Sequence, residues 1–323
     1  MLQPEFSAAA NIHAQASLHS DPELWAVHAQ LIRLDPTGLR FAQVLRDTID
    51  QLLNGEVTGR YEWEKLYKTE KTHAGTLVEI NLQREFSFDD GVAMDYRIAG
   101  VDVDCKYSQR FGSWMIPPEA VGHLCLLVWA DDLTSRWSAG LLRIEEEWLT
   151  GGKNRDSKLS VKAEHRSKIL WLWHHAELPE NVLLHLPEDT RNSILSLASG
   201  QKRVNELFRR VQRRRIGRGV IRTVAQQSDY MARVREAKGR ARTVLREEGL
   251  LIPGHFSSHQ AIARTLGVAV PRQGELVSFR VASARPHHAD RPRVELGGRS
   301  WVLADEGDPV EAAPFLPKHT DSD

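Results

Sequence analysis

The spacing of apolar residues predicts helices in the first part of the chain. From Pro22 to Leu53 the apolar positions follow a helical period, with a break at Asp35–Gly38. A further helix is expected from Gly75 to Phe86, where every fourth residue from Val78 onward is apolar. Residues 1–20 are rich in Ala, Gln and His and are expected to form a loose tail.

After residue 91 the apolar residues alternate, which is typical of strands. Two strands are expected at Ala93–Ile98 and Val101–Ser108, joined by a tight turn. Leu124–Ala130 is a continuous apolar run that predicts a buried strand, and Trp137–Ile144 predicts another. Ser160–His174 is expected to be helical. This order of helices and strands indicates an α/β or α+β first domain.

The rest of the pattern predicts a second domain of a different kind. A chain of 323 residues suggests two domains at about 150 residues each. We expect a linker around residues 170–180, a first domain over residues 20–172 and a second over residues 180–316. In the second, helices precede short strands, an order that fits a winged-helix arrangement. A helix-turn-helix can lie within Gly219–Val234, although one long helix fits that stretch equally well.

The distribution of charge changes this picture, although the net charge is zero. The chain has 43 Lys and Arg and 43 Asp and Glu. Residues 201–246 contain 15 Lys and Arg against three acids, so this basic block carries +12 and the rest of the chain −12. Helical apolar spacing persists in the block, which favours a folded nucleic-acid-binding surface. A solvated basic face, or a docking surface for the acidic part of the chain, is the alternative.

Several other classes of protein are excluded by composition. The longest apolar run has seven residues, whereas a membrane helix needs about 20. No basic segment followed by an apolar block marks a secretory signal at the N-terminus. The two cysteines, Cys105 and Cys125, cannot form a disulfide framework, and the pairs His174-His175 and His287-His288 lack the spacing of zinc ligands. We therefore expect a cytoplasmic protein that does not associate with membranes.

The segment 94–106 contains the candidate chemistry. Alternation along its second strand puts Asp102, Asp104 and Lys106 on one face. The preceding strand carries Asp95, which the tight turn brings toward the same point. Two carboxylates beside an amine suit Mg²⁺ and phosphodiester hydrolysis, because the metal binds hard oxygens and the amine stabilises charge on the phosphate. The spacing Asp-x(8)-Asp-x-Lys matches a nuclease pattern, although an Asp–Lys pair on a strand is more often plain surface.

Three nearby residues extend this hypothesis. Glu79 lies on the helix before the strands, at the edge of its apolar stripe, and is a candidate third carboxylate. The alternative for Glu79 is an ordinary exposed helix acid. Asp102 is one step further from Lys106 than Asp104 and is a candidate supporting group. Cys105 is expected to face the core, while its backbone carbonyl can still reach a metal.

These residues are part of a longer resemblance. From roughly residue 30 to residue 312, the chain resembles the NaeI-type (type IIE) restriction endonucleases. The matching segments are Val44–Thr48, Lys68–His73, Gly75–Leu82, Val103–Lys106, Trp114-Met115, Pro117–Glu119, Arg203–Val211, Thr223–Gln227 and Gly307–Pro309. They lie in both halves of the chain and in order, so the resemblance is far more specific than the motif alone.

The resemblance implies a fold and an activity. It implies a restriction-endonuclease-like domain of the α/β (α+β) class, followed by a winged-helix-like (helix-turn-helix) DNA-binding domain. The first domain would use Mg²⁺ to cut both strands of double-stranded DNA, leaving 5′-phosphate and 3′-hydroxyl ends. The second would bind another copy of the recognition site and activate cleavage. A homodimer, a palindromic GC-rich site similar to GCCGGC and a cognate methyltransferase encoded nearby are also implied.

The family's active-site positions fall on Glu79, Asp95, Asp104 and Lys106, with the three carboxylates as metal ligands. The basic block suits the second DNA site, and phosphate contacts there would make binding depend strongly on salt. The preferred DNA contacts are Arg209, Arg210, Arg213, Arg214, Arg218, Arg222, Arg233 and Arg235. Two other functions stay open: a DNA-binding regulator on a non-catalytic nuclease scaffold, and a nicking or mismatch-repair nuclease. The intact set of four site residues argues against the regulator.

Overall fold

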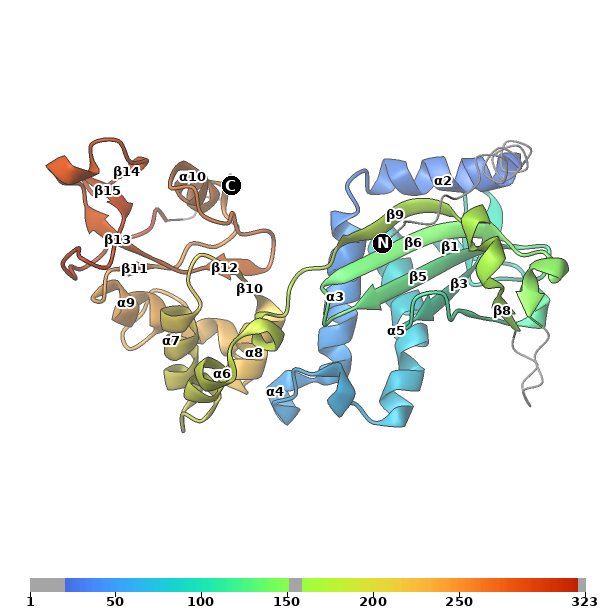
Figure 1. The fold of residues 1–323 in the computed structure, drawn as a ribbon, viewed down its shortest axis with the longest axis horizontal. Coiled ribbons are helices and arrows are strands. Elements are labelled where there is room, and N and C mark those ends of the chain that lie inside the picture. Colours follow the sequence, from blue (N-terminus) through green and yellow to red (C-terminus); the bar gives the residue numbers. More distant parts are fainter. Residues whose placement is uncertain (1–20, 151–158, 319–323) are drawn as a thin grey trace, which may run out of the picture. The chain divides into compact units, whose positions relative to one another are not determined.

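The structure is a computed structural model, and it describes residues 21–150 and 159–318 (Figure 1). The expected tail over residues 1–20 lies outside the described residues. The chain divides into two compact units. The first comprises residues up to Leu52 together with Leu66–Pro179, and the second comprises Leu53–Lys65 together with the chain from Glu180 onward. Every helix in the described ranges is too short or too polar to span a lipid bilayer.

A six-stranded sheet forms the centre of the first unit, with strand order β1-β2-β3-β5-β6-β9 (Figure 1). β3 and β5 are parallel, and the other neighbouring pairs are antiparallel. The strand bounds are Asp89–Asp90 (β1), Tyr96–Ile98 (β2), Val101–Ser108 (β3), Leu124–Asp131 (β5), Arg136–Arg143 (β6) and Leu170–Glu177 (β9). A smaller sheet contains β4 (Met115–Ile116), β8 (Leu159–Val161) and β7 (Leu149–Thr150). β5 is buried along nearly its whole length, because β3 and β6 flank it.

Three long helices pack in this unit: α2 (Pro22–Leu34), α3 (Leu39–Leu53) and α5 (Lys68–Phe86). α5 packs against β3, and α2 packs against β6 and β9. The break between α2 and α3 falls at Asp35, as the sequence predicts, while α5 begins before the expected start. The mixed α/β class expected for the first domain is confirmed.

The prediction of a helix at Ser160–His174 is wrong. This stretch contains most of β8, a 3-10 helix at Ala163–Lys168 and the start of β9. On β6, Ala139 and Gly140 lie opposite two tryptophans of β9. A Cβ on Gly140 would lie 2.8 Å from the ring of Trp171, so these small residues leave room for the indole rings. Pairing with β6 therefore outweighs the local helical spacing.

The second unit combines short helices with two small antiparallel sheets (Figure 1). Its helices are α4 (Gly55–Thr58), α6 (Glu188–Leu195), α7 (Gly200–Arg210), α8 (Arg218–Ala225), α9 (Ala241–Arg246) and α10 (Ser257–Thr265). One sheet pairs β10 (Arg215–Gly217) with β12 (Glu275–Val277). The other has the order β11-β13-β15-β14, with bounds Leu250–Leu251, Phe279–Ser283, Arg299–Leu303 and Arg293–Leu296. Buried apolar residues of α7, α8 and α9 share one core.

Residues 219–234 do not form one long helix. α8 ends at Ala225, Gln226 has a left-handed φ of +50°, and a short 3-10 helix follows at Tyr230–Arg233. The stretch is therefore an α-helix and a short 3-10 helix separated by a turn, and the expectation of one long helix is wrong.

The segment Leu53–Lys65 packs with the second unit, although it connects two helices of the first. Its helix α4 lies against α8. A Cβ on Gly55 would lie 2.0 Å from the hydroxyl oxygen of Thr223, so this close approach requires glycine. The side-chain amide of Asn181 donates a hydrogen bond to the carbonyl oxygen of Tyr61, 2.9 Å away. The segment is thus built into the second unit by its own contacts.

Candidate active site

The β2–β3 hairpin and helix α5 bring the candidate site residues together. The hairpin turns at Ala99-Gly100, where both residues have positive φ, and returns β3 beside β2. Asp95 immediately precedes β2, whereas Asp104 and Lys106 lie on β3. Glu79 lies on α5, and the Tyr96 hydroxyl donates a hydrogen bond of 2.7 Å to its carbonyl oxygen. The fold thereby gathers all four residues chosen from the sequence.

The Lys106 ammonium is the centre of this cluster. Its Nζ lies 2.5 Å from Asp104 Oδ1 and 3.5 Å from Asp95 Oδ2. It also donates to the carbonyl oxygen of Cys105 at 3.1 Å. The Cys105 side chain is buried, as the alternation along β3 predicts.

Two hydrogen bonds orient the aspartates. The backbone N–H of Cys105 donates to Asp95 Oδ2 at 2.7 Å. The thiol of Cys125, on β5, donates to Asp104 Oδ2 at 3.2 Å. Cys125 lies opposite Asp104 in the β3–β5 register, and the sequence analysis did not assign it a role. In the sequence, Cys125 is one residue of a continuous apolar run. Its contact with Asp104 becomes visible only when the pairing of β3 with β5 is known.

Negative charge is in excess at this site. Burial and the neighbouring Asp95 raise the pKa of Glu79. Burial raises the pKa of Asp104 as well, and the opposing effect of Lys106 does not cancel the rise. Burial lowers the pKa of Lys106, but the negative charges of Asp104 and Asp95 outweigh this effect. The pKa of Lys106 is raised to about 12 as a result. Lys106 is therefore a cation at neutral pH, with three carboxylates around it.

This donor set fits a hard divalent cation. Glu79, Asp95 and Asp104 offer carboxylate oxygens, and a cation would stabilise the charged carboxylates, two of whose pKa values are raised by burial and by the neighbouring Asp95. Asp104 is only 4% exposed, while Asp95 and Lys106 keep about a quarter of their side chains accessible to solvent. The cluster is thus buried enough to strengthen electrostatic interactions, while Asp95 and Lys106 remain in contact with solvent.

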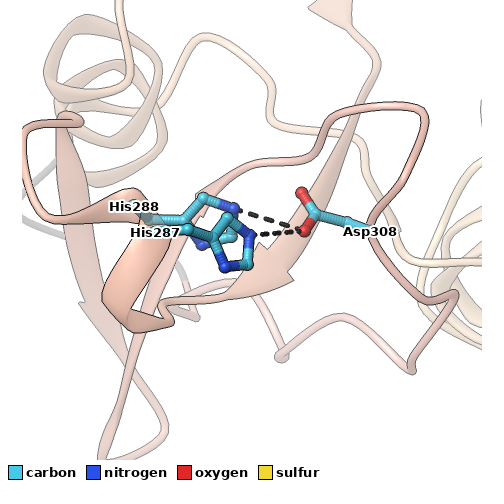
Figure 2. A group of neighbouring side chains, drawn as sticks. All are labelled: His287, His288 and Asp308. Carbon is cyan, nitrogen blue, oxygen red and sulfur yellow. Dashed lines mark hydrogen bonds and ion pairs between the residues drawn. The ribbon is translucent and has the colours of Figure 1, made fainter.

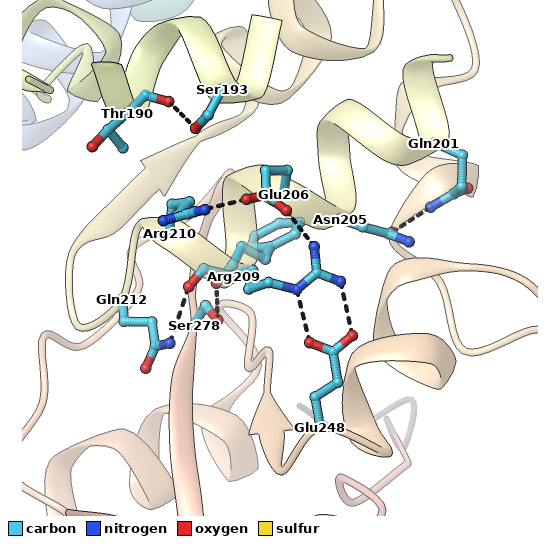
Figure 3. A network of polar contacts seen from close by, with 11 residues as sticks. Thr190, Ser193, Gln201, Asn205, Glu206, Arg209, Arg210, Gln212, Glu248 and Ser278 are labelled. Atoms are coloured by element: carbon cyan, nitrogen blue, oxygen red, sulfur yellow. Dashed lines mark hydrogen bonds and ion pairs between the residues drawn. The ribbon is translucent and has the colours of Figure 1, made fainter. Parts of the chain in front are cut away.

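The expected DNA-contact arginines differ in their partners and in their exposure to solvent. Arg209 lies between Glu206 and Glu248, with bonds of 2.7 and 2.8 Å to the two oxygens of Glu248, and Arg210 contacts Glu206 (Figure 3). Arg214 pairs with Glu180 at 2.6 Å. Arg210 is exposed despite its contact with Glu206, and Arg213, Arg218 and Arg235 are exposed as well.

A second cluster contains His287 and His288, from the 3-10 helix Pro286–His288, and Asp308, from the loop after β15 (Figure 2). Asp308 Oδ1 lies 3.3 Å from His287 Nε2 and 3.2 Å from His288 Nε2. Nδ1 of the buried His288 accepts the backbone N–H of Arg285, which places the proton of a neutral ring on Nε2. A metal-binding Nε2 would need that proton on Nδ1 instead. The cluster therefore fits a structural clamp better than a metal site.

Comparison with known proteins identifies the family. The family model of restriction endonuclease NaeI matches residues 26–312. The type II restriction enzyme NaeI of Lentzea aerocolonigenes is 51% identical to the chain over 305 residues, covering 92% of this chain and 95% of that protein. The chain belongs to the NaeI restriction endonuclease family. It is thus a type II restriction endonuclease, a site-specific nuclease that binds double-stranded DNA, and its mixed α/β first unit is consistent with the restriction-endonuclease-like fold.

Proposed function

We propose that this NaeI-family enzyme uses Mg²⁺ at Glu79, Asp95 and Asp104 to cut both strands of DNA, with Lys106 as the fourth catalytic residue. The observation that carries the proposal is the excess of carboxylates around a single, protonated lysine. A bound Mg²⁺ would polarise a phosphoryl oxygen and lower the pKa of a water molecule. The carboxylates would bind the ion, since they are hard oxygen donors on three different structural elements.

The protein's own residues would perform the remaining tasks. Lys106 stays charged at neutral pH, so it can orient the attacking water and offset negative charge as the phosphorus becomes five-coordinate. The N–H of Cys105 and the thiol of Cys125 hold Asp95 and Asp104 in fixed orientations. Such preorganisation avoids rearrangement of the site during the reaction.

We further propose that the first unit is the endonuclease domain and the second a winged-helix-like domain that binds another copy of the recognition site. The basic block and its exposed arginines support this assignment. The recognition site would be palindromic and GC-rich, similar to GCCGGC, which suits a homodimer because a two-fold axis matches a palindrome. Activation by the second DNA copy would require a coupling of about 1–3 kcal/mol between the two sites. A cognate methyltransferase would protect the host DNA.

Cleavage of unmethylated, GC-rich plasmid DNA tests this proposal. Wild type, Asp104→Ala and Lys106→Ala would be assayed with Mg²⁺ and with EDTA, with and without an added site-bearing oligonucleotide. Discrete double-strand fragments that require Mg²⁺, increase with the oligonucleotide and vanish in both variants support it. DNA binding without any cutting, across plasmids with varied palindromes, would instead identify a non-catalytic regulator. Single-strand cuts by a monomer, measured by light scattering, would identify a nicking enzyme.

A further inference from the structure

The loop that delivers Asp95 has few apolar contacts to hold it. It spans residues 91–95, between β1 and β2, and Val92 within it is 84% exposed. A Cβ on Gly91 would lie 2.1 Å from the carbonyl oxygen of Met94, so the loop folds back tightly on itself. Met94 packs against the core, whereas Val92 and Ala93 are exposed, so the position of that part of the loop depends on hydrogen bonds from neighbouring elements.

Asp102 provides such hydrogen bonds from β3. Its carboxylate accepts the backbone N–H of Val92 at 3.1 Å and that of Ala93 at 2.7 Å. Asp102 lies two residues before Asp104, so the strand that carries one site carboxylate also fixes the loop that carries another. The role differs from that of a group beside Lys106, because the contacts of Asp102 are made to the loop backbone.

We propose that Asp102 is a positioning residue, which holds Asp95 at the metal site through the backbone of residues 92–93. The inference rests on the proposed function, in which Asp95 is a metal ligand. Without the carboxylate of Asp102, the two N–H groups would bind water and the loop would occupy other positions. Metal affinity would then fall in proportion to the fraction of molecules with Asp95 in place, while the residues of the chemical step stay intact.

Calcium binding and the magnesium dependence of cleavage test this role in the full-length protein. In Asp102→Ala, we expect affinity for Ca²⁺, measured by calorimetry without DNA, to fall about tenfold, the size typical of groups that orient metal ligands. The Mg²⁺ concentration for half-maximal cleavage should rise by the same factor, while the rate at saturating Mg²⁺ stays within about threefold of wild type. Asp102→Asn keeps one acceptor oxygen and should give an intermediate value.

Arg97→Ala is the matched control, because Arg97 is exposed and lies directly opposite Asp102 in the β2–β3 register. It removes a neighbouring charge without touching the loop hydrogen bonds, so its metal affinity should equal that of wild type. Hydrogen exchange of the 91–95 amides should accelerate in Asp102→Ala and not in Arg97→Ala. If Asp102→Ala does not fold, Asp102→Asn carries the same test.

The outcomes separate this inference from the proposed function. Wild type that neither binds Ca²⁺ nor cleaves with Mg²⁺ overturns both. Wild type that does so, with Asp102→Ala showing the same metal affinity, overturns the positioning role alone. A lower melting temperature in Asp102→Ala with unchanged metal affinity would likewise show a purely structural residue and overturn it.

Discussion

In the first unit, three carboxylates surround the ammonium group of Lys106. In the second unit, Arg209 and Arg210 form ion pairs with Glu206 and Glu248. Around Lys106 the charges do not balance, and burial, together with the neighbouring Asp95, raises the pKa values of Glu79 and Asp104. Around Arg209 they do balance, through Glu206 and Glu248 (Figure 3). The unbalanced cluster around Lys106 destabilises the fold, and its excess negative charge favours the binding of a cation. The balanced network stabilises the fold and leaves Arg209 less able to bind a phosphate.

This comparison changes which arginines we expect to bind DNA. A guanidinium that already forms paired bonds with a carboxylate must lose them before it binds a phosphate. Arg209 is in that position, while Arg213, Arg218 and Arg235 are exposed. The sequence ranks all of them equally, and the structure separates them by their exposure and by the paired bonds of Arg209 with Glu248.

The largest expected effect comes from neutralising the unbalanced cluster. Asp104→Asn should reduce cleavage by at least about 100-fold, because it removes a charged ligand from the reaction centre. The same change should raise the melting temperature of the metal-free protein, since burial disfavours the charged Asp104 carboxylate by more than its ion pair with Lys106 stabilises it. Plasmid cleavage and thermal unfolding measure the two effects. If metal-free Asp104→Asn is less stable than metal-free wild type, the charge of Asp104 does not destabilise the site in the absence of metal.

A smaller effect is expected on DNA binding by the basic block. Arg235→Ala should weaken binding to any sequence and reduce the salt dependence of log K by about one unit, as the loss of one phosphate contact does. Arg209→Ala serves as the comparison and should change the salt dependence much less. Fluorescence anisotropy over a range of salt concentrations measures both. If the two variants give equal slopes of log K against log salt concentration, pairing with Glu248 does not prevent Arg209 from binding a phosphate.

The ion pairs of Arg209 with Glu206 and Glu248 should contribute to the stability of the fold. Arg209→Ala should lower the free energy of unfolding by about 1 kcal/mol, because the pair is partly exposed to solvent and its attraction is screened. Arg235→Ala should leave stability nearly unchanged, since the side chain is on the surface. Urea unfolding of both variants gives the comparison, and a larger loss in Arg235→Ala would reverse it.

The smallest expected effect is on the pH dependence of stability. A carboxyl whose pKa is raised in the folded state binds its proton more tightly there than in the unfolded chain. Its ionisation therefore destabilises the fold above that raised pKa, and the penalty disappears as pH falls to the ordinary values of 3.8 for Asp and 4.5 for Glu. Relative to Glu79→Gln/Asp104→Asn, metal-free wild type should lose stability as pH rises from 4 to 7. Added Ca²⁺ should reduce that difference.

Much of the active site follows from local patterns. Alternation along residues 101–108 puts Asp104 and Lys106 two residues apart on one strand, and a short turn returns Asp95 to them. Apolar spacing from Val78 to Phe86 predicts the helix that carries Glu79. These features depend on contacts near in sequence, so periodicity and turn residues are enough to predict them.

Other parts of the site depend on pairings that no local pattern contains. The contact of Cys125 with Asp104 exists because β5 runs parallel to β3 in one register. The helical expectation for Ser160–His174 is wrong because the small residues of β6 accept the tryptophans of β9. Asp102 lies two residues from the candidate metal ligand Asp104 in sequence, yet its carboxylate accepts hydrogen bonds from Val92 and Ala93.

The family, the mixed α/β class of the first unit and the four residues of the candidate site can all be inferred without a structure. This is possible because these depend on residue identity and on short-range periodicity. Only the tertiary structure decided which arginines are paired, that Leu53–Lys65 packs against α8, and how Asp95 is held. These features depend on residues brought together by packing and hydrogen bonding across distant parts of the chain, where burial and charge pairing set their energies.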